Sequence, residues 1–265
     1  MKLLVQSDDF GITRAVTCGI VYGIEHGIIR NTGMFTNMPW VNECVERIKP
    51  YLGQIALGID LNISTGTPIL PPDKIPTLVR ADGTFLTSWE SRKLDQTADN
   101  GNHAAYEDIY SEFDAQINLF IELTGKKPDY LHAHAYMTDR IVQIQRELSK
   151  KYDVIYSSDA WQYMTGYGIG EYRMSWYIKP STLENQLTSS LKEYILKNGD
   201  TMLKRDYGLI VGHMGYVDRE LMNLSTYNIY RLNDLDAVTS PEVLNWVKNN
   251  NVELITYKEI EELMH

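Results

Sequence analysis

Short apolar runs alternate with amphipathic segments along almost the whole chain, and this alternation constrains the fold more than any other feature. The run Leu3–Gln6 precedes a segment, Arg14–His26, whose apolar residues recur at helical spacing. The same order returns about seven times, which predicts parallel strands joined by helical crossovers. In a chain of 265 residues, this order favours one α/β domain built as a deformed (β/α) barrel, with a doubly wound open sheet as the alternative.

The pattern predicts the individual elements and two interruptions. Strands are expected at Leu3–Gln6, Thr32–Asn37, Gln54–Ile63, Asp129–His134, Val154–Ser157, Tyr207–His213 and Val252–Thr256. Helices are expected at Arg14–His26, Val41–Tyr51, His103–Thr124, Asp139–Lys151, Ser181–Lys197, Ser240–Asn249 and a short C-terminal segment. A proline-rich stretch at about 64–102 predicts a loop insertion over a binding face. Residues 158–179, rich in aromatic residues and glycine, predict a second loop.

Composition excludes several classes of partner. The net charge is −10, and no cluster of lysine or arginine is present, which argues against nucleic acid and against a membrane surface. The N-terminus has no signal-peptide pattern and the two cysteines have no paired spacing, so a cytoplasmic protein is expected. Eighteen tyrosines and five tryptophans outnumber five phenylalanines, and such rings with a polar group suit sugar faces.

Polar side chains follow four of the predicted strands at the point where each strand ends. Adjacent carboxylates repel one another, and a fold tolerates them where a cation or a proton lies between them. The carboxyl ends of parallel barrel strands meet at one rim, so these residues should lie close together. They are Asp8 and Asp9 after the first strand, Asp60 and Asn62 after the third, His132 and His134 after the fourth, and His213 after the sixth.

This set of carboxylates and imidazoles predicts a site for one divalent cation. Oxygen ligands favour Mg²⁺ or Mn²⁺, whereas imidazole also admits Zn²⁺; Mg²⁺ is the first choice here. The chain contains no His-Glu-x-x-His motif, no phosphate-binding P-loop and no Gly-x-Ser-x-Gly motif.

Several segments resemble the YdjC-like carbohydrate deacetylases. The stretch 7–11, Ser-Asp-Asp-Phe-Gly, is similar to the Asp-Asp-Phe-Gly signature of that family. The resemblance runs almost end to end and includes residues 58–62 with 65–68, residues 128–134, His213 with Gly215 and Tyr216, and Tyr227, Arg231 and Asp236.

The resemblance implies a metal-dependent hydrolase that removes N-acetyl groups from an amino sugar or a small chito-oligosaccharide, phosphorylated ones included. By position, Asp8 would be the general base and His213 the proton donor, whereas Asp9, Asp60 and His134 would bind the metal. The candidate substrate-binding residues are Asn62, Thr65, His132, Tyr136, Trp40 and Arg231. The implied partner is a small carbohydrate, and a homodimer is an open option.

The chain departs from the family pattern at the candidate site. Asp60 stands where the family has histidine, and His132 stands where it has aspartate. An anionic ligand in place of a neutral one favours a harder cation. These departures leave two alternatives open: cleavage of a phosphorylated disaccharide or phosphoester, and a carbohydrate-binding relative without catalysis.

Overall fold

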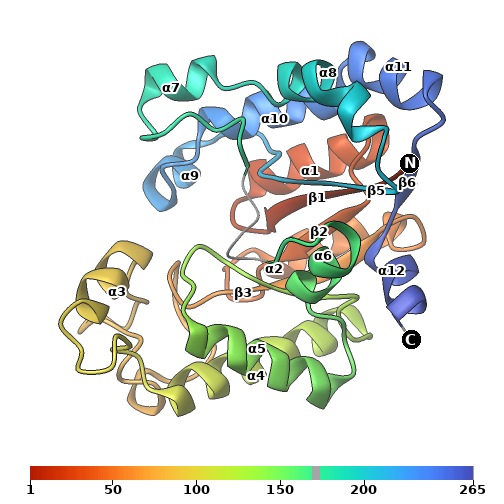
Figure 1. The fold of residues 1–265 in the computed structure, drawn as a ribbon. Coiled ribbons are helices and arrows are strands. Elements are labelled where there is room, and N and C mark those ends of the chain that lie inside the picture. The colour runs from red at the N-terminus through yellow and green to blue at the C-terminus, as the bar shows by residue number, and fades with distance from the viewer. Residues whose placement is uncertain (169–173, 265) are drawn as a thin grey trace.

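The computed structural model describes residues 1–168 and 174–264, and within them one parallel sheet of six strands forms the centre of the molecule (Figure 1). The strands run in the spatial order β4-β3-β2-β1-β5, and β6 also pairs with β1. Their bounds are β1 (Lys2–Phe10), β2 (Asn31–Met34), β3 (Ala56–Leu61), β4 (Leu131–Ala133), β5 (Tyr207–Gly212) and β6 (Glu253–Ile255). The predicted α/β class with parallel strands is confirmed, and the described strand pairs do not close the sheet.

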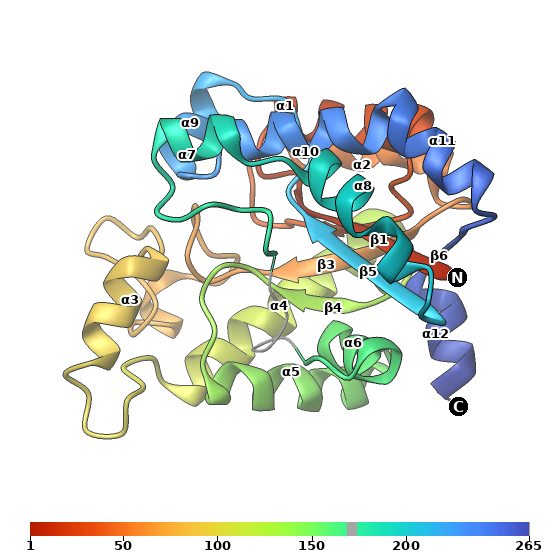
Figure 2. The same ribbon diagram turned by 45° about the horizontal axis from the view of Figure 1, so that its top comes forward.

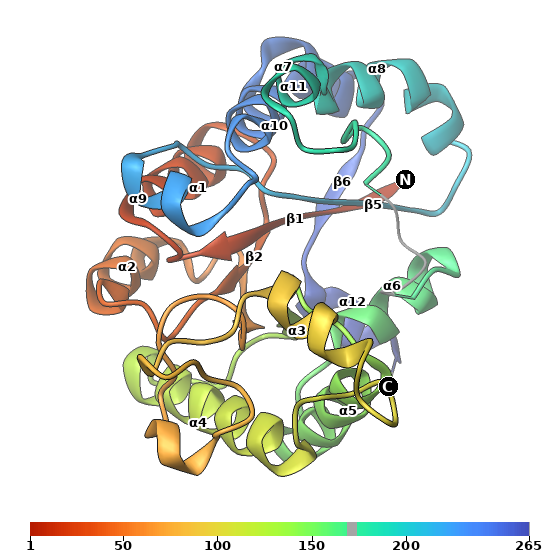
Figure 3. The ribbon, with the colours of Figure 1, turned by 90° about the vertical axis from the view of Figure 1, so that its left-hand side faces the viewer.

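Helices surround the strands, as Figure 3 shows from one end of the molecule. Strands β3 and β5 point toward the end where α3, α7 and α9 lie (Figure 2). The helices are α1 (Arg14–His26), α2 (Val41–Ile48), α3 (Ser88–Asp95), α4 (Tyr106–Thr124), α5 (Asp139–Tyr152), α6 (Ser157–Thr165), α7 (Leu183–Thr188), α8 (Leu191–Met202), α9 (Arg219–Leu224), α10 (Ile229–Thr239), α11 (Pro241–Asn249) and α12 (Tyr257–Met264), with 3-10 turns η1 (Lys49–Tyr51) and η2 (Pro72–Lys74).

Strand β1 is the hub of the sheet because it has three parallel partners. Its first residues, Lys2–Leu4, pair with both β5 and β6, so these two strands lie on opposite sides of β1. Its last residues pair with β2. The side chain of Asn31 links β1, β2 and β6. It donates to the carbonyls of Val5 and Ile255 and accepts from the Tyr257 N–H.

Two predicted elements are wrong near the middle of the chain. The predicted strand 154–157 is a single parallel bridge between Leu131 and Tyr156, because helix α6 begins at Ser157. Residues 158–165 of the predicted loop are therefore helical, and residues 169–173 of that loop lie outside the described residues.

The predicted helix 181–197 is two helices, α7 and α8. They separate at Ser189 and Ser190, where the chain is extended and the Ser190 side chain caps α8 by accepting from the Glu193 N–H. Helices α9 and α10 were not predicted, and α10 carries Arg231.

The predicted insertion at about 64–102 contains η2, α3 and one antiparallel bridge between Val79 and Phe85. Two acids of α4 hold it in place. Glu112 accepts from the backbone N–H groups of Ile69 and Leu70, and Asp108 accepts from the Thr77 N–H and hydroxyl. These contacts fix the insertion beside the carboxyl ends of the strands.

In the parts of the chain that the structure describes, none of the helices combines the length and the apolar character that crossing a bilayer requires.

Replacing Asn31 should destabilise the sheet at its hub. Asn31→Ala removes three buried hydrogen bonds and leaves the Tyr257 N–H without its acceptor, so we expect the free energy of unfolding to fall by roughly 3 kcal/mol. Urea denaturation measures this change. Asn250→Ala is the control, because that exposed side chain makes one local bond to the Trp246 carbonyl and should change stability by no more than about 0.5 kcal/mol. Equal losses in the two variants would contradict the role of Asn31.

Candidate functional site

A β-bulge places both carboxylates of the Asp8-Asp9 pair at the end of β1. Ser7 pairs with Thr32 and Phe10 pairs with Met34. Between these two pairs β1 advances by three residues and β2 by two, so β1 has one extra residue. Successive strand residues normally point to opposite faces, and the extra residue of a bulge breaks that alternation. Asp9 adopts a left-handed conformation with φ 69°, a backbone state that is costly for a residue other than glycine.

Asp8, Asp60 and His132 form a buried group in which one potential ligand atom of each lies within 4.8 Å of the others. Asp60 and His132 are direct partners in the register of β3 and β4. His132 Nε2 lies 3.7 Å from Asp8 Oδ2, while Nδ1 lies 2.8 Å from the Ser157 hydroxyl. Ser157 thus orients the ring so that Nε2 faces the two acids. A metal-binding histidine is commonly oriented in this way, by a hydrogen bond to its other ring nitrogen.

The surroundings of Asp60 fit a cation. Its Oδ2 accepts from the Asp9 N–H at 2.7 Å, whereas its Oδ1 is buried and has no hydrogen-bond partner among the described residues. Gly33 of β2 makes room for this carboxylate, because a Cβ there would lie 1.7 Å from Asp60 Oδ1. A buried carboxylate oxygen without a donor is costly unless a cation or a proton satisfies it. The donor set of two carboxylates and one imidazole suits a divalent ion.

The two adjacent acids, Asp8 and Asp9, have opposite pKa shifts. Burial, reinforced by the charge of Asp9, raises the pKa of Asp8 well above its usual value. Burial also acts on Asp9, but His134 and Arg231 outweigh it and hold the pKa of Asp9 well below its usual value. Burial, followed by repulsion from Asp8, raises the pKa of Asp60 to about 7. The Asp8–Asp60 group therefore favours a bound proton or cation, whereas Asp9 is ionised.

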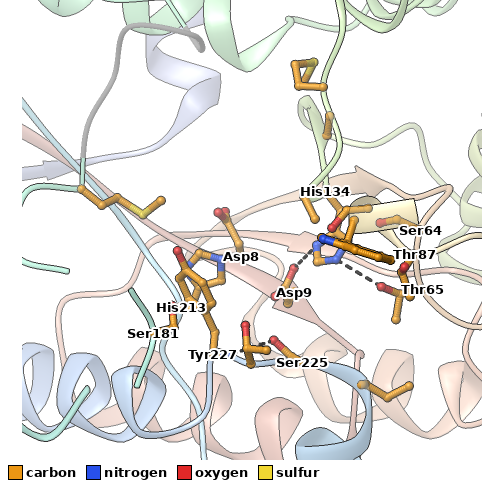
Figure 4. Close-up of a pocket in the computed structure, with 18 of the residues that line it drawn as sticks. Asp8, Asp9, Ser64, Thr65, Thr87, His134, Ser181, His213, Ser225 and Tyr227 are labelled. Atoms are coloured by element: carbon orange, nitrogen blue, oxygen red, sulfur yellow. Dashed lines mark hydrogen bonds and ion pairs between the residues drawn. The ribbon is translucent and has the colours of Figure 1, made fainter. Parts of the chain in front are cut away.

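Asp9 and His134 form a second group beside the first (Figure 4). Asp9 Oδ1 lies 2.7 Å from His134 Nδ1, and Asp9 Oδ2 accepts from the guanidinium of Arg231 at 2.5 Å. His134 Nε2 lies 3.3 Å from the Thr65 hydroxyl, so both ring nitrogens have partners. The buried ion pair between β1 and α10 fixes the direction of the Asp9 carboxylate.

His213 follows β5 and lies next to Asp8 in Figure 4. Its Nδ1 lies 3.2 Å from the Tyr177 hydroxyl, which in turn donates to the buried carboxylate of Asp234. The His213 backbone N–H donates to the same carboxylate at 3.1 Å, as does the Trp176 indole. Burial lowers the pKa of His213 to about 3, and burial raises the pKa of Asp234 to about 7. The imidazole is therefore neutral.

A cavity of about 750 Å³ adjoins both the Asp8–Asp60–His132 group and the Asp9–His134 group. Lys179 lines it, with Nζ 4.0 Å from the centroid of the Tyr227 ring and 3.2 Å from the Ser181 hydroxyl. The lining is rich in hydroxyl and aromatic groups. It includes Asp8, Asp9, Thr65, Thr87, Ser88, Trp89, Arg92, His132, His134, Trp161, Lys179, Ser181, His213, Ser225, Tyr227 and Arg231.

The predicted substrate contacts divide into two sets. Thr65, His132 and Arg231 line the cavity. The others do not belong to its lining and make internal contacts: Asn62 holds the loop after β3 through Asn37 and Thr65, Tyr136 donates to Asp95, and Trp40 donates to the Gly11 carbonyl.

Sequence reasoning missed Ser157, which contacts His132, and the Tyr177–Asp234 pair, which contacts His213. Tyr177 lies in the segment that was predicted only as a loop, and Asp234 lies on a helix that was not predicted. The count of tyrosines was the one available signal, and it did not single out a position.

Comparison with known proteins places the chain in a family. The sequence profile of the family described as YdjC-like protein matches residues 2–249. Carbohydrate deacetylase 2 of Listeria innocua is 31% identical over 262 residues, which cover 98% of this chain and 99% of that protein. A carbohydrate deacetylase of Clostridium beijerinckii is 28% identical over 270 residues, which cover 98% of this chain and 100% of that protein.

A crystal structure from Enterococcus faecalis, described provisionally as a cellobiose-phosphate cleavage protein, has the same fold. Its TM-score is 0.75 at 23% identity, with 98% of both chains covered. The profile match spans most of the chain and the Listeria relative matches end to end. The chain therefore belongs to the YdjC-like family.

Proposed function

We propose that this protein is a cation-dependent hydrolase that removes the N-acetyl group from an amino sugar or a small chito-oligosaccharide. One observation carries the proposal: the buried group of Asp8, Asp60 and His132 opens into a cavity lined by hydroxyl and aromatic side chains. The curated relatives named carbohydrate deacetylase support the substrate class. Metal analysis of the purified protein, paired with acetate release from N-acetylated mono- and disaccharides, tests it.

Asp8, Asp60 and His132 would hold the cation, because Asp60 Oδ1 has no other partner and both carboxylates have raised pKa values. When bound there, a divalent cation would supply Lewis acidity toward the acetyl carbonyl oxygen and a water molecule. The oxygen ligands favour Mg²⁺, with Mn²⁺ and Zn²⁺ as alternatives.

Asp9 is our candidate proton acceptor. Arg231 and His134 keep its carboxylate ionised and oriented, and its backbone N–H contacts Asp60, so it lies next to the cation-binding group. This division reverses the roles that the family resemblance suggests for Asp8 and Asp9. A base that is ionised at neutral pH can accept the proton of the attacking water.

His213 is our candidate for carrying a proton to the leaving nitrogen. When Tyr177 donates to Asp234, its oxygen can accept a hydrogen bond from His213 Nδ1–H. Nε2 would then take up the proton that Asp9 has removed from the attacking water and pass it to the leaving amine as the carbon–nitrogen bond breaks. Tyr177 and Asp234 position the imidazole without contacting the substrate.

The second candidate function is cleavage of a phosphorylated disaccharide or a phosphoester. Lys179 favours an anionic substituent on the sugar, because its ammonium lies at the cavity beside hydroxyl groups and forms no ion pair with a described residue. Free acetate as the product supports the first function. A monosaccharide or inorganic phosphate as the product supports the second, and binding without any product supports a non-catalytic relative.

The cytoplasmic location, the homodimer and the single-domain organisation stay predictions, as does the absence of nucleic-acid and membrane partners.

The roles of the two adjacent acids can be separated by Asp8→Asn and Asp9→Asn. We expect Asp8→Asn to weaken binding of Mg²⁺ or Mn²⁺ by at least roughly tenfold, because it removes a ligand. Asp9→Asn should keep the cation but lower kcat by about 10²–10⁴, because it removes the base. Titration calorimetry and acetate release measure the two effects.

Asp9→Asn also leaves a buried arginine without its partner, and this can lower stability independently of catalysis. Melting temperatures are therefore recorded for this variant and for Asp9→Asn/Arg231→Met, which removes both charges. The reverse pattern, in which Asp8→Asn binds the cation normally and Asp9→Asn does not, would restore the division of roles that the resemblance suggests.

Stability should depend on pH through Asp60. Its pKa of about 7 lies above the value of about 4 in an unfolded chain, so folding takes up a proton and stability falls as pH rises through that window. In the presence of a chelator, we expect wild-type protein to lose more stability between pH 5 and pH 7 than Asp60→Asn. Added Mg²⁺ or Mn²⁺ should offset the loss in wild-type protein only. Thermal unfolding across this range measures both effects, and parallel curves for the two proteins would refute the argument.

Tyr177→Phe should change the protonation pattern of His213. The variant keeps the ring and removes the hydroxyl, so His213 Nδ1–H loses its acceptor and the alternative tautomer becomes populated. We expect kcat to fall roughly tenfold with little change in KM. Nitrogen-15 NMR of labelled histidine reads the tautomer directly. An unchanged tautomer with reduced kcat would assign Tyr177 a purely structural role.

A further inference from the structure

Helix α3 carries an exposed tryptophan at the cavity. The Trp89 side chain is 68% exposed and is also part of the cavity lining. Tryptophan is highly buried on average, because its large apolar surface is costly to leave in water. An indole that stays exposed beside a binding cavity is therefore a candidate contact for a ligand rather than for the core.

Several contacts hold the start of α3 in a fixed position. Thr87 and Glu90 form a capping box, in which each side chain bonds to the backbone of the other residue. Arg80 forms an ion pair with Glu90, and the Arg92 guanidinium donates to the Ala135 carbonyl, one residue after His134. The indole is thus attached to a helix tied to the catalytic end of β4. A preorganised side chain loses less entropy when it binds a ligand.

The groups around Trp89 match the chemistry of a sugar ring. Thr87, Ser88 and Arg92 line the same cavity as Trp89, and the Lys93 ammonium lies over the indole, 5.3 Å from its ring centroid. The Arg92 side chain forms no ion pair with a described residue. A sugar presents an apolar ring face that packs on an aromatic ring, and a rim of hydroxyl groups that needs hydrogen-bonding partners.

We propose that Trp89 is the platform of a second sugar subsite, so that the cavity binds an N-acetylated oligosaccharide of two or more rings. The reacting ring lies at the Asp8–Asp60–His132 group, and the neighbouring ring packs on the Trp89 indole with its hydroxyl groups toward Thr87, Ser88 and Arg92. This inference rests on the proposed function and adds the position that makes affinity depend on substrate length.

Binding without turnover tests the subsite. Chelator-treated protein is titrated with N-acetylglucosamine, its dimer and its trimer in a calorimeter, so that affinity is measured whether or not the protein releases acetate. We expect wild-type protein to bind the trimer more tightly than the monomer. Trp89→Ala should lower the ratio of trimer to monomer affinity by roughly tenfold, the size expected when an aromatic packing contact is lost. Trp89→Phe should recover most of this ratio.

Leu94→Ala is the matched control, because Leu94 lies on the same helix, is 42% exposed and is not part of the cavity lining. It should leave the ratio unchanged. A ratio that survives Trp89→Ala, or that Leu94→Ala lowers equally, would overturn the subsite while leaving the proposed function in place. Failure of wild-type protein to bind any of the three sugars would overturn both.

Discussion

The bulge at Asp8 and Asp9 is the constraint on which the rest of the site depends. A regular strand would send one carboxylate into the cavity and the other into the opposite face of the sheet. The extra residue lets both reach the same end of β1, at the cost of a left-handed backbone at Asp9. The Asp60 carboxylate stabilises this conformation by accepting from the Asp9 N–H, and Arg231 neutralises the Asp9 side chain. Removing either partner would leave a buried group of the bulge unsatisfied.

The bulge also separates the chemistry of two neighbouring acids. Asp8 faces Asp60 and His132, where negative charge accumulates and a cation or proton is favoured. Asp9 faces Arg231 and His134, where negative charge is compensated. Paired carboxylates whose environments move their pKa values apart are a common basis for dividing catalytic roles. Here the difference comes from Arg231 on α10 and from His134, which directly follows β4.

Two of the departures that the family resemblance indicates, at positions 60 and 132, face each other in the structure. The resemblance leads us to expect histidine at position 60 and aspartate at position 132, whereas this chain has Asp60 and His132, which are paired in the register of β3 and β4. The exchange keeps one carboxylate and one imidazole in the same pair of strands. In this chain the imidazole stands on β4, where the Ser157 hydroxyl at the start of α6 orients it.

The sequence by itself determined the parallel α/β class, most of the strands and the rim at which the polar residues gather. Apolar periodicity reports burial directly, and parallel strands must place their carboxyl ends together. Only the tertiary structure decided which polar residues meet: the bulge, the pairing of Asp60 with His132, and the Tyr177–Asp234 support of His213. Each depends on a register shift, an element boundary or a helix such as α10 that brings together residues far apart in the chain. Local sequence patterns carry no information on such distances.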